Sequence, residues 1–84
     1  MDIINPATGV VISTIKSDTK KTLNSKLETL RKGQKSWIKT AIEDRLICIK
    51  KFGELIQENK FELAQILTLE TGKPLRQSLN EIQG

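Results

Sequence analysis

The spacing of apolar residues along this 84-residue chain changes once, near residue 16. Before that point β-branched residues dominate: Ile3 and Ile4 precede a turn-forming stretch at residues 5–9, and a second β-branched run follows. Pro6 fixes its φ and Gly9 can adopt a positive φ, so the stretch suits a tight connection. The pattern predicts a β-hairpin over residues 1–16, which is marginal in water unless it packs on something else.

From residue 17 onward the apolar residues recur at helical spacing. Ser17 and Asp18 are both good N-caps, so we expect one of them to begin the first helix. Gly33 weakens this helix near its end by roughly 1 kcal/mol relative to alanine. The apolar positions of the first helix share one face and are Leu23, Leu27, Leu30, Trp37 and Ile38.

A second helix is expected to begin at a capping box formed by Thr40 and Glu43. Its apolar stripe is broad, which suggests that the helix is covered on more than one side. The stripe consists of Leu46, Ile47, Ile49, Phe52, Leu55 and Ile56.

Two further helices complete the pattern. Asn59 is the expected N-cap of the third helix, Gly72 its end, and Pro74 suits the first turn of the fourth. The fold class is therefore mainly α with a short N-terminal β-hairpin (α+β): a single unit, residues 1–84, with a hairpin at 1–16 and a helical segment at 17–84. The apolar residues of these two helices are Phe61, Leu63, Ala64, Ile66, Leu67 and Leu69, then Leu75, Leu79 and Ile82.

The charged residues do not point to a nucleic acid or a membrane. They make up 29% of the chain with a net charge of +4, which is too mixed for a disordered polyelectrolyte. Residues 1–39 carry eight basic and three acidic groups, but a solvated helix face explains this surplus. The longest strictly aliphatic run, Val10–Ile12, is far short of a membrane span, and no secretory signal is visible, so we expect a cytoplasmic protein with neither partner.

The candidate chemistry is sparse. Histidine is absent and Cys48 is the single cysteine, so we expect no metal site, and we expect Cys48 to be a buried structural thiol. Glu43 and Asp44 suit the positive end of a helix dipole. A phosphate loop would need a second glycine near Gly72 and a hydroxyl residue after Lys73, and no dinucleotide fingerprint occurs. We therefore expect no catalytic, cofactor-binding or metal-binding residue.

Two segments taken together resemble the aldehyde dehydrogenase superfamily. Residues 4–12 (INPATGVVI) are similar to the NPATGE-V-I stretch with which family members typically begin, with Val10 in place of the usual glutamate. Residues 67–75 (LTLETGKPL) are similar to the family signature L-x-x-E-x-G-K-P-L. Between them Trp37 and the helix start around Arg45 also resemble the family, and the order and spacing match from residue 3 to residue 82.

The resemblance implies a part of a longer enzyme. It implies a hairpin and helices that belong to the N-terminal part of the cofactor-binding domain, while the nucleophile, the general base and the dinucleotide site come from later segments. The complete enzyme would oxidise an aldehyde or semialdehyde with NAD or NADP, and this chain alone would be inactive. Its partner would be the remainder of the enzyme. The broad apolar stripes by themselves predict that the isolated chain forms a dimer or higher oligomer through exposed apolar faces of the two middle helices. A fragment, a truncated gene product and a free-standing helical interaction module all stay open as interpretations.

Overall fold

The computed structural model describes residues 1–84 and begins with an antiparallel hairpin. Strand β1 (Asp2–Ile4) pairs with strand β2 (Val11–Thr14), and the register shifts between Ile3 and Ile4. The connecting turn forms as its residues predict: Asn5 Oδ1 accepts from the backbone N–H of Ala7 at 2.9 Å, and Gly9 adopts a φ of 73°. The predicted hairpin is therefore confirmed.

Helix α1 (Lys20–Trp37) follows an extended link and begins slightly later than expected. Thr19, not Ser17 or Asp18, is its N-cap, and its hydroxyl oxygen accepts from the backbone N–H of Thr22. Thr22 completes the capping box, because its own hydroxyl oxygen accepts from the backbone N–H of Thr19 at 2.8 Å. Asp18 supports this turn from outside the helix.

Helices α2 (Ile42–Glu58) and α3 (Lys60–Thr71) follow one another almost without interruption, separated only by Asn59. The predicted capping box at Thr40 is wrong: Ala41 is the N-cap, and the Thr40 hydroxyl donates to the carbonyl oxygen of Ser36 at 3.3 Å. Asn59 occupies the expected N-cap of α3 but does not cap it with its side chain. Its Nδ2 donates instead to the carbonyl oxygen of Leu55 at 2.8 Å, closing the end of α2.

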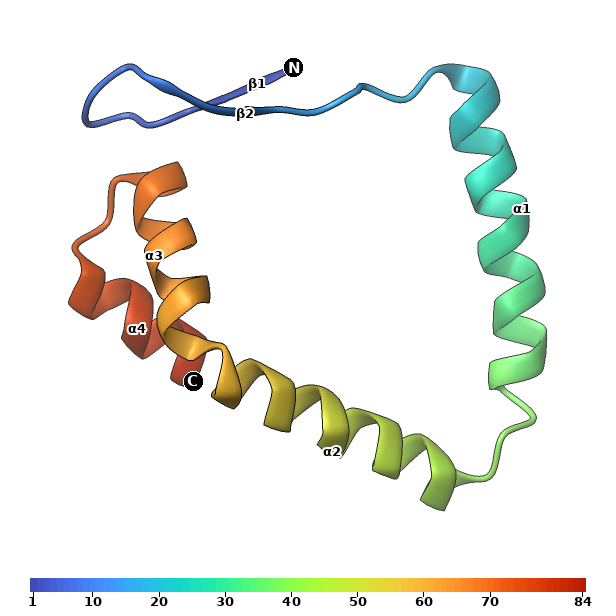
Figure 1. Ribbon diagram of the computed structural model, residues 1–84. Coiled ribbons are helices and arrows are strands. Elements are labelled where there is room, and N and C mark those ends of the chain that lie inside the picture. Colours follow the sequence, from blue (N-terminus) through green and yellow to red (C-terminus); the bar gives the residue numbers. More distant parts are fainter.

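Gly72 ends α3 in the left-handed conformation, with a φ of 75°, as predicted. Helix α4 (Leu75–Gln83) starts directly after Pro74, whose missing N–H costs nothing at this position. The chain reverses between the two helices, and α3 and α4 form the most extensive helix pair of the molecule. Figure 1 shows them side by side below the hairpin.

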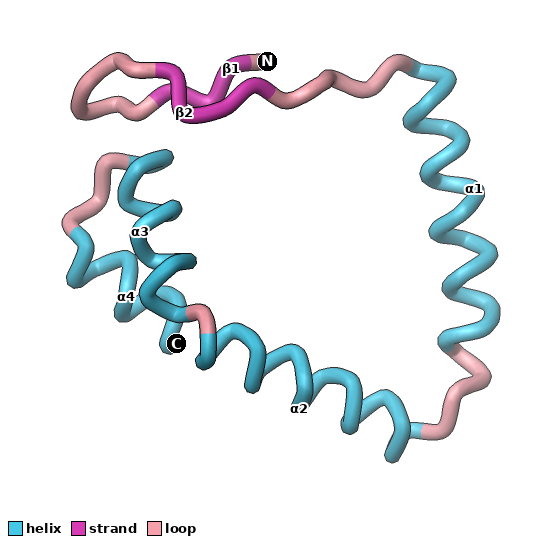
Figure 2. The backbone as a smooth tube through the Cα atoms, viewed as in Figure 1, coloured by secondary structure: helices cyan, strands magenta, loops and turns pink.

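The elements follow an arc and do not stack around a common core (Figure 2). The molecule extends 47 × 34 × 14 Å, so it is about one helix diameter thick. Its radius of gyration is 17.3 Å, against about 12 Å for a compact domain of this length. Only Ala64 and Ser78 are buried, both in the helix pair α3 and α4.

The arc returns to its start where the turn of the hairpin meets the end of α3. A Cβ atom added to Gly72 would lie 3.0 Å from Pro6 Cγ, so the turn of the hairpin touches the end of α3. Pro6 and Gly72 are far apart in sequence, and this contact places the hairpin over the loop between α3 and α4 (Figure 1).

Candidate functional site: an apolar groove between three helices

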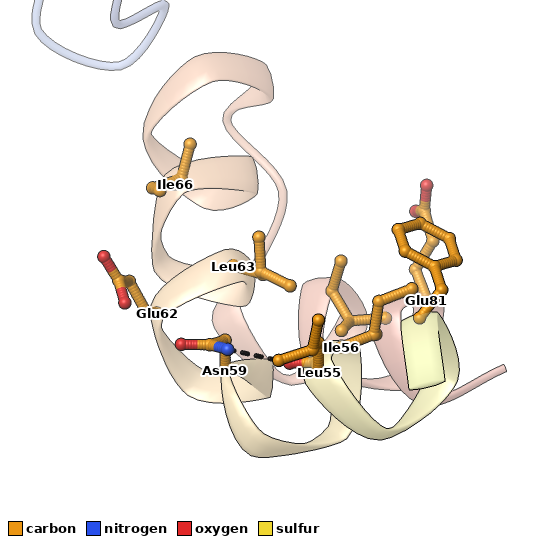
Figure 3. Close-up of a pocket in the computed structure, with 9 residues that line it drawn as sticks. Leu55, Ile56, Asn59, Glu62, Leu63, Ile66 and Glu81 are labelled. Carbon is orange, nitrogen blue, oxygen red and sulfur yellow. Dashed lines mark hydrogen bonds between the residues drawn. The ribbon is translucent and has the colours of Figure 1, made fainter. Parts of the chain in front are cut away.

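A groove of about 720 Å³ lies where α2, α3 and α4 meet. We call it the α2–α4 groove. Six of its nine lining residues are apolar; the nine are Phe52, Leu55, Ile56, Asn59, Glu62, Leu63, Ile66, Glu81 and Ile82. Figure 3 shows Leu63 directed into the space between α3 and α2, with Glu62 and Glu81 at opposite sides of the view.

The corner at Asn59 shapes this groove. Its φ of −104° and ψ of 15° lie outside the helical region and redirect the chain from α2 into α3. Two hydrogen bonds to the carbonyl oxygen of Leu55 fix the corner. One comes from the Asn59 backbone N–H at 3.1 Å, and the other from Asn59 Nδ2 at 2.8 Å, the bond drawn in Figure 3. The bend directs Leu55 of α2 and Leu63 of α3 toward a shared concave surface.

Small residues bring α3 and α4 close together on the other side of the groove. Ala64 and Ser78 are fully buried, and Ser78 Oγ accepts a hydrogen bond from Thr68 Oγ1 at 2.8 Å. This bond satisfies the buried hydroxyl, which would otherwise be costly. An ion pair between Lys73 and Glu81 holds the intervening loop to α4.

The α2–α4 groove is suited to binding an apolar surface. The side-chain amide of Asn59 in the groove is already hydrogen-bonded, since its Nδ2 donates to a backbone carbonyl. The carboxylate of Glu81 is paired with Lys73, and no serine, threonine, cysteine, histidine or lysine lies among the lining residues as a catalytic partner for Glu62. No group of three or more histidine, cysteine, aspartate or glutamate residues could hold a metal ion.

The residues present do not fit a dinucleotide cofactor. The one sheet is a two-stranded antiparallel hairpin, whereas dinucleotide sites lie at the carboxyl edge of a parallel sheet. The α2–α4 groove carries carboxylates at Glu62 and Glu81, which would repel a diphosphate. No step of a hydride-transfer reaction is therefore assigned to this chain.

The predicted burial of Cys48 is wrong. The thiol is exposed on α2 and does not line the α2–α4 groove. The physical reason is that α2 contacts α3 and α4 only at its C-terminal end, while the part that carries Cys48 has no neighbouring element. The broad apolar stripe on either side of it, including Leu46 and Ile49, is exposed as well.

The other singled-out residues have local structural roles. Glu43 and Asp44 lie in the first turn of α2, where they favour the helix dipole as predicted. Thr71 Oγ1 donates to the carbonyl oxygen of Leu67 at 2.7 Å, and Lys73 pairs with Glu81, so neither group is free for a phosphate. The turn at residues 71–74 is the predicted helix stop and restart.

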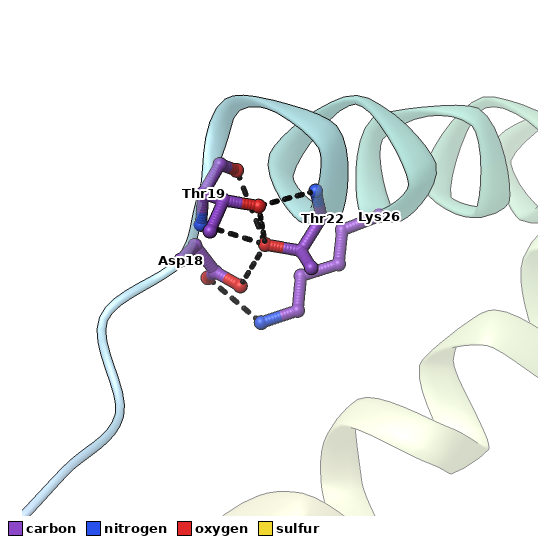
Figure 4. A network of polar contacts seen from close by, with 4 residues as sticks. All are labelled: Asp18, Thr19, Thr22 and Lys26. Carbon is purple, nitrogen blue, oxygen red and sulfur yellow. Dashed lines mark hydrogen bonds and ion pairs between the residues drawn. The ribbon is translucent and has the colours of Figure 1, made fainter.

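The start of α1 contains the densest polar network of the molecule (Figure 4). Asp18 accepts from Lys26 Nζ and from Thr22 Oγ1, at 2.8 Å and 2.9 Å. These hydrogen bonds, that from Lys26 first, hold the pKa of Asp18 below its usual value of 3.8. Sequence reasoning missed this network, although the pair Thr19 and Thr22 at capping-box spacing was its signal.

Comparison with known proteins identifies the family. A sequence profile described as "Aldehyde dehydrogenase family" matches residues 1–84. The chain belongs to the aldehyde dehydrogenase family. It is 35% identical to malonate-semialdehyde dehydrogenase from Bacillus cytotoxicus, and 37% identical to enzymes of that name from Bacillus thuringiensis and Bacillus anthracis. Each alignment covers 94% of this chain but 16% of the relative.

The chain thus spans about a sixth of the length of the curated relatives it matches. No solved structure matches it. The two segments that carry the family resemblance in the sequence, residues 4–12 and 67–75, come together in space, because Pro6 of the first touches Gly72 of the second. The α+β fold expected from the family is confirmed, with four helices after an N-terminal hairpin. No helix of this structure has the length and apolar character that crossing a bilayer requires.

Proposed function

We propose that this chain is the N-terminal structural segment of an NAD(P)-dependent aldehyde dehydrogenase. The observation that carries this proposal is the family match over all 84 residues, combined with relatives of which those residues are only 16%. The role of the chain is to form the hairpin and helices onto which later segments pack, and it contributes no catalytic or cofactor-binding residue of its own.

The complete enzyme oxidises an aldehyde to a carboxylate with NAD or NADP, and its substrate is a semialdehyde. The support for this substrate class is the name shared by the relatives, malonate-semialdehyde dehydrogenase. The expected cytoplasmic location stays a prediction.

The surface of the chain supports a structural role. Large apolar side chains of all four helices are exposed, among them Leu30, Ile47, Phe61 and Leu75. Exposed apolar surface on this scale marks a contact with another segment or chain. Arg45 adds a polar requirement, since its Nε is buried without a hydrogen-bond partner, and a covering segment can supply the acceptor.

A chimera tests the proposal directly. The matching segment of the Bacillus thuringiensis relative is replaced by residues 1–84 of this chain, and NAD-dependent oxidation of malonate semialdehyde is followed by absorbance of the reduced cofactor. We expect the chimera to fold and to turn over, because a structural segment from the same family presents equivalent apolar faces.

A matched control is the same chimera with Leu63→Asp. A carboxylate at this position of the α2–α4 groove would be buried by the covering segment without a partner, so the control is expected to lose folded protein. A well-folded but inactive chimera would contradict the proposal, since the replaced segment would then supply a group for catalysis or binding. A chimera that does not fold would contradict the structural equivalence.

A further inference from the structure

Arg45 differs from the rest of the N-terminal part of α2. Every other residue at positions 42–55 is exposed, whereas Arg45 is partly buried. Its Nε is shut off from solvent and has no hydrogen-bond partner, and no other side-chain nitrogen or oxygen of the molecule is in this state. A buried donor without an acceptor is destabilising, so this nitrogen calls for a partner.

The chain itself does not supply that partner. Its three ion pairs join lysines to Asp18, Glu54 and Glu81, and none of them includes Arg45. Glu43 is close to Arg45 in sequence but forms no ion pair with it. The two Nη groups of Arg45 are not shut off from solvent as Nε is, so a segment that packs on α2 can reach them.

The surface of α2 around Arg45 carries no other charge. Its neighbours three and four positions away are Ala41, Ile42, Cys48 and Ile49, and all four are exposed. The proposed function assigns such apolar faces to contact with later segments of the enzyme. Covering this face would remove water from the Nη groups as well, so the whole guanidinium would become buried.

The chemistry of a guanidinium restricts the partner. An arginine side chain is charged at physiological pH and is almost never fully buried unless it is paired. Backbone carbonyls would accept from its N–H groups but leave its charge uncompensated, whereas a carboxylate does both. A carboxylate also matches the planar fork of the guanidinium, because two parallel hydrogen bonds can form. These requirements select an aspartate or glutamate side chain.

We propose that Arg45 forms an ion pair with an aspartate or glutamate of the later segment that covers α2 in the complete enzyme. The inference rests on the proposed function, because it takes the chain to be the N-terminal segment of a dehydrogenase. It adds the chemical identity of one contact between that segment and the remainder. The pair fixes where the covering segment lies along α2, since a shifted arrangement would bury the guanidinium without its partner.

Substitutions in the chimera that carries residues 1–84 in the Bacillus thuringiensis enzyme test this contact. Arg45→Met keeps an apolar stem and removes the charge. Arg31→Met and Arg76→Met are matched controls, because both arginines are exposed. Breaking a buried ion pair leaves the other charge unpaired, so we expect Arg45→Met to shorten the half-life of the folded chimera at a fixed elevated temperature by at least about tenfold. Each control should shorten it by less than about threefold, as measured by circular dichroism.

Cross-linking identifies the partner residue. In the chimera with Arg45→Lys, a carbodiimide joins the introduced amine to a carboxylate in contact with it, forming an amide bond with loss of water. Peptide mass mapping is expected to place this bond on an aspartate or glutamate of the remainder of the enzyme. Lys50 is the internal control, because it lies five positions further along α2 and so on another face. We expect at least roughly tenfold less cross-link from Lys50 to the same carboxylate.

The mapped carboxylate allows a second test with both charges removed. Changing it to its amide together with Arg45→Met leaves no unpaired charge, so the combined variant should outlast Arg45→Met alone. If Arg45→Met yields no folded chimera, the combined variant should restore folded protein. Loss of folded chimera with Arg45→Lys as well, while both controls fold, would support the proposal, because a lysine lacks the fork of arginine.

Three results would overturn the ion pair and leave the proposed function intact, since the unaltered chimera would still fold and turn over. The first is a half-life with Arg45→Met equal to that of the controls. The second is a folded Arg45→Lys chimera whose introduced amine joins no carboxylate, or joins only Glu43 or Asp44 of its own helix. The third is a combined variant whose losses simply add. An unaltered chimera that does not fold would instead contradict the proposed function, and the ion pair with it.

Discussion

Gly72 meets two structural requirements, a positive φ and a close approach of the hairpin. Its φ of 75° is a conformation that side chains with a Cβ adopt only with strain, and an added Cβ would lie 3.0 Å from Pro6 Cγ. The residue therefore ends α3 and lets the hairpin approach. Gly9 has nearly the same φ, 73°, but nothing lies within 4 Å of its added Cβ.

These two glycines allow the strain and the contact to be separated. Gly72→Ala is expected to reduce the free energy of unfolding by about 2 kcal/mol, and Gly9→Ala by about 1 kcal/mol, because only the former adds a close contact to the unfavourable φ. Urea unfolding at one fixed chain concentration measures both. Equal losses would show that Pro6 does not constrain position 72.

Asp18 makes the start of α1 sensitive to acid. Because its pKa is lowered below 3.8, the carboxylate stabilises the folded state above that pH, and the stabilisation is lost as the pH falls through the lower folded-state value. A titration of the Asp18 carboxyl carbon by NMR measures the folded value. Lys26→Gln should return it toward 3.8, since Lys26 donates the leading hydrogen bond; an unchanged pKa in this variant would contradict the network.

The accessibility of the Cys48 thiol shows whether this part of α2 is covered. With the thiol exposed, Cys48→Ser is expected to change the free energy of unfolding by less than about 0.5 kcal/mol and, in a complete enzyme, to leave turnover intact. Labelling by a maleimide should proceed at similar rates in native and urea-unfolded chain. Labelling only after unfolding, or a large loss of turnover in folded enzyme, would show that this thiol has been assigned wrongly.

Among the helices, α1 is the one whose stability comes mainly from local terms, because all of its residues are exposed and it is not in extensive contact with another element. Gly33 interrupts it, and nothing lies within 4 Å of a Cβ added there. Gly33→Ala is therefore expected to stabilise the helix by about 1 kcal/mol, with Gln34→Ala as a control of smaller effect. Far-ultraviolet circular dichroism during thermal unfolding measures the change; no gain would mean that position 33 contacts a partner closely.

The order and type of the elements could be predicted from the sequence because each has a local signal. The β-branched runs around the turn at Asn5 predicted the hairpin, and Gly72 and Pro74 marked the boundary between the last two helices. The prediction was wrong about which residues cap the first two helices. Thr40 has the spacing of a capping box, yet its hydroxyl bonds back to Ser36, since backbone carbonyls at the end of α1 compete for it.

The α2–α4 groove could not be predicted in the same way. It depends on the corner at Asn59 and on the close approach of Ala64 and Ser78, which bring apolar residues of three helices together. The apolar stripes were visible in the sequence, but periodicity does not say which stripe faces which. Cys48 shows the same limit, because an apolar neighbourhood in sequence does not ensure a neighbour in space.

The molecule as a whole is a single-layer arc. Its exposed apolar surface agrees with its family resemblance, because both indicate a part of a larger enzyme. A thickness of 14 Å leaves no second layer to pack against, so the apolar faces need another segment or chain. In a complete dehydrogenase the later segments would supply that layer. We propose that these 84 residues contribute this apolar surface to the complete enzyme.

Complementation in trans tests this central claim most directly. A Bacillus malonate-semialdehyde dehydrogenase, shortened by the residues that match this chain, is mixed with the 84-residue chain, and reduction of NAD or NADP is followed with malonate semialdehyde. The account predicts no turnover from either piece alone and turnover from the mixture. Turnover by the chain alone, or an inactive mixture in which the two pieces are bound to each other, would contradict it.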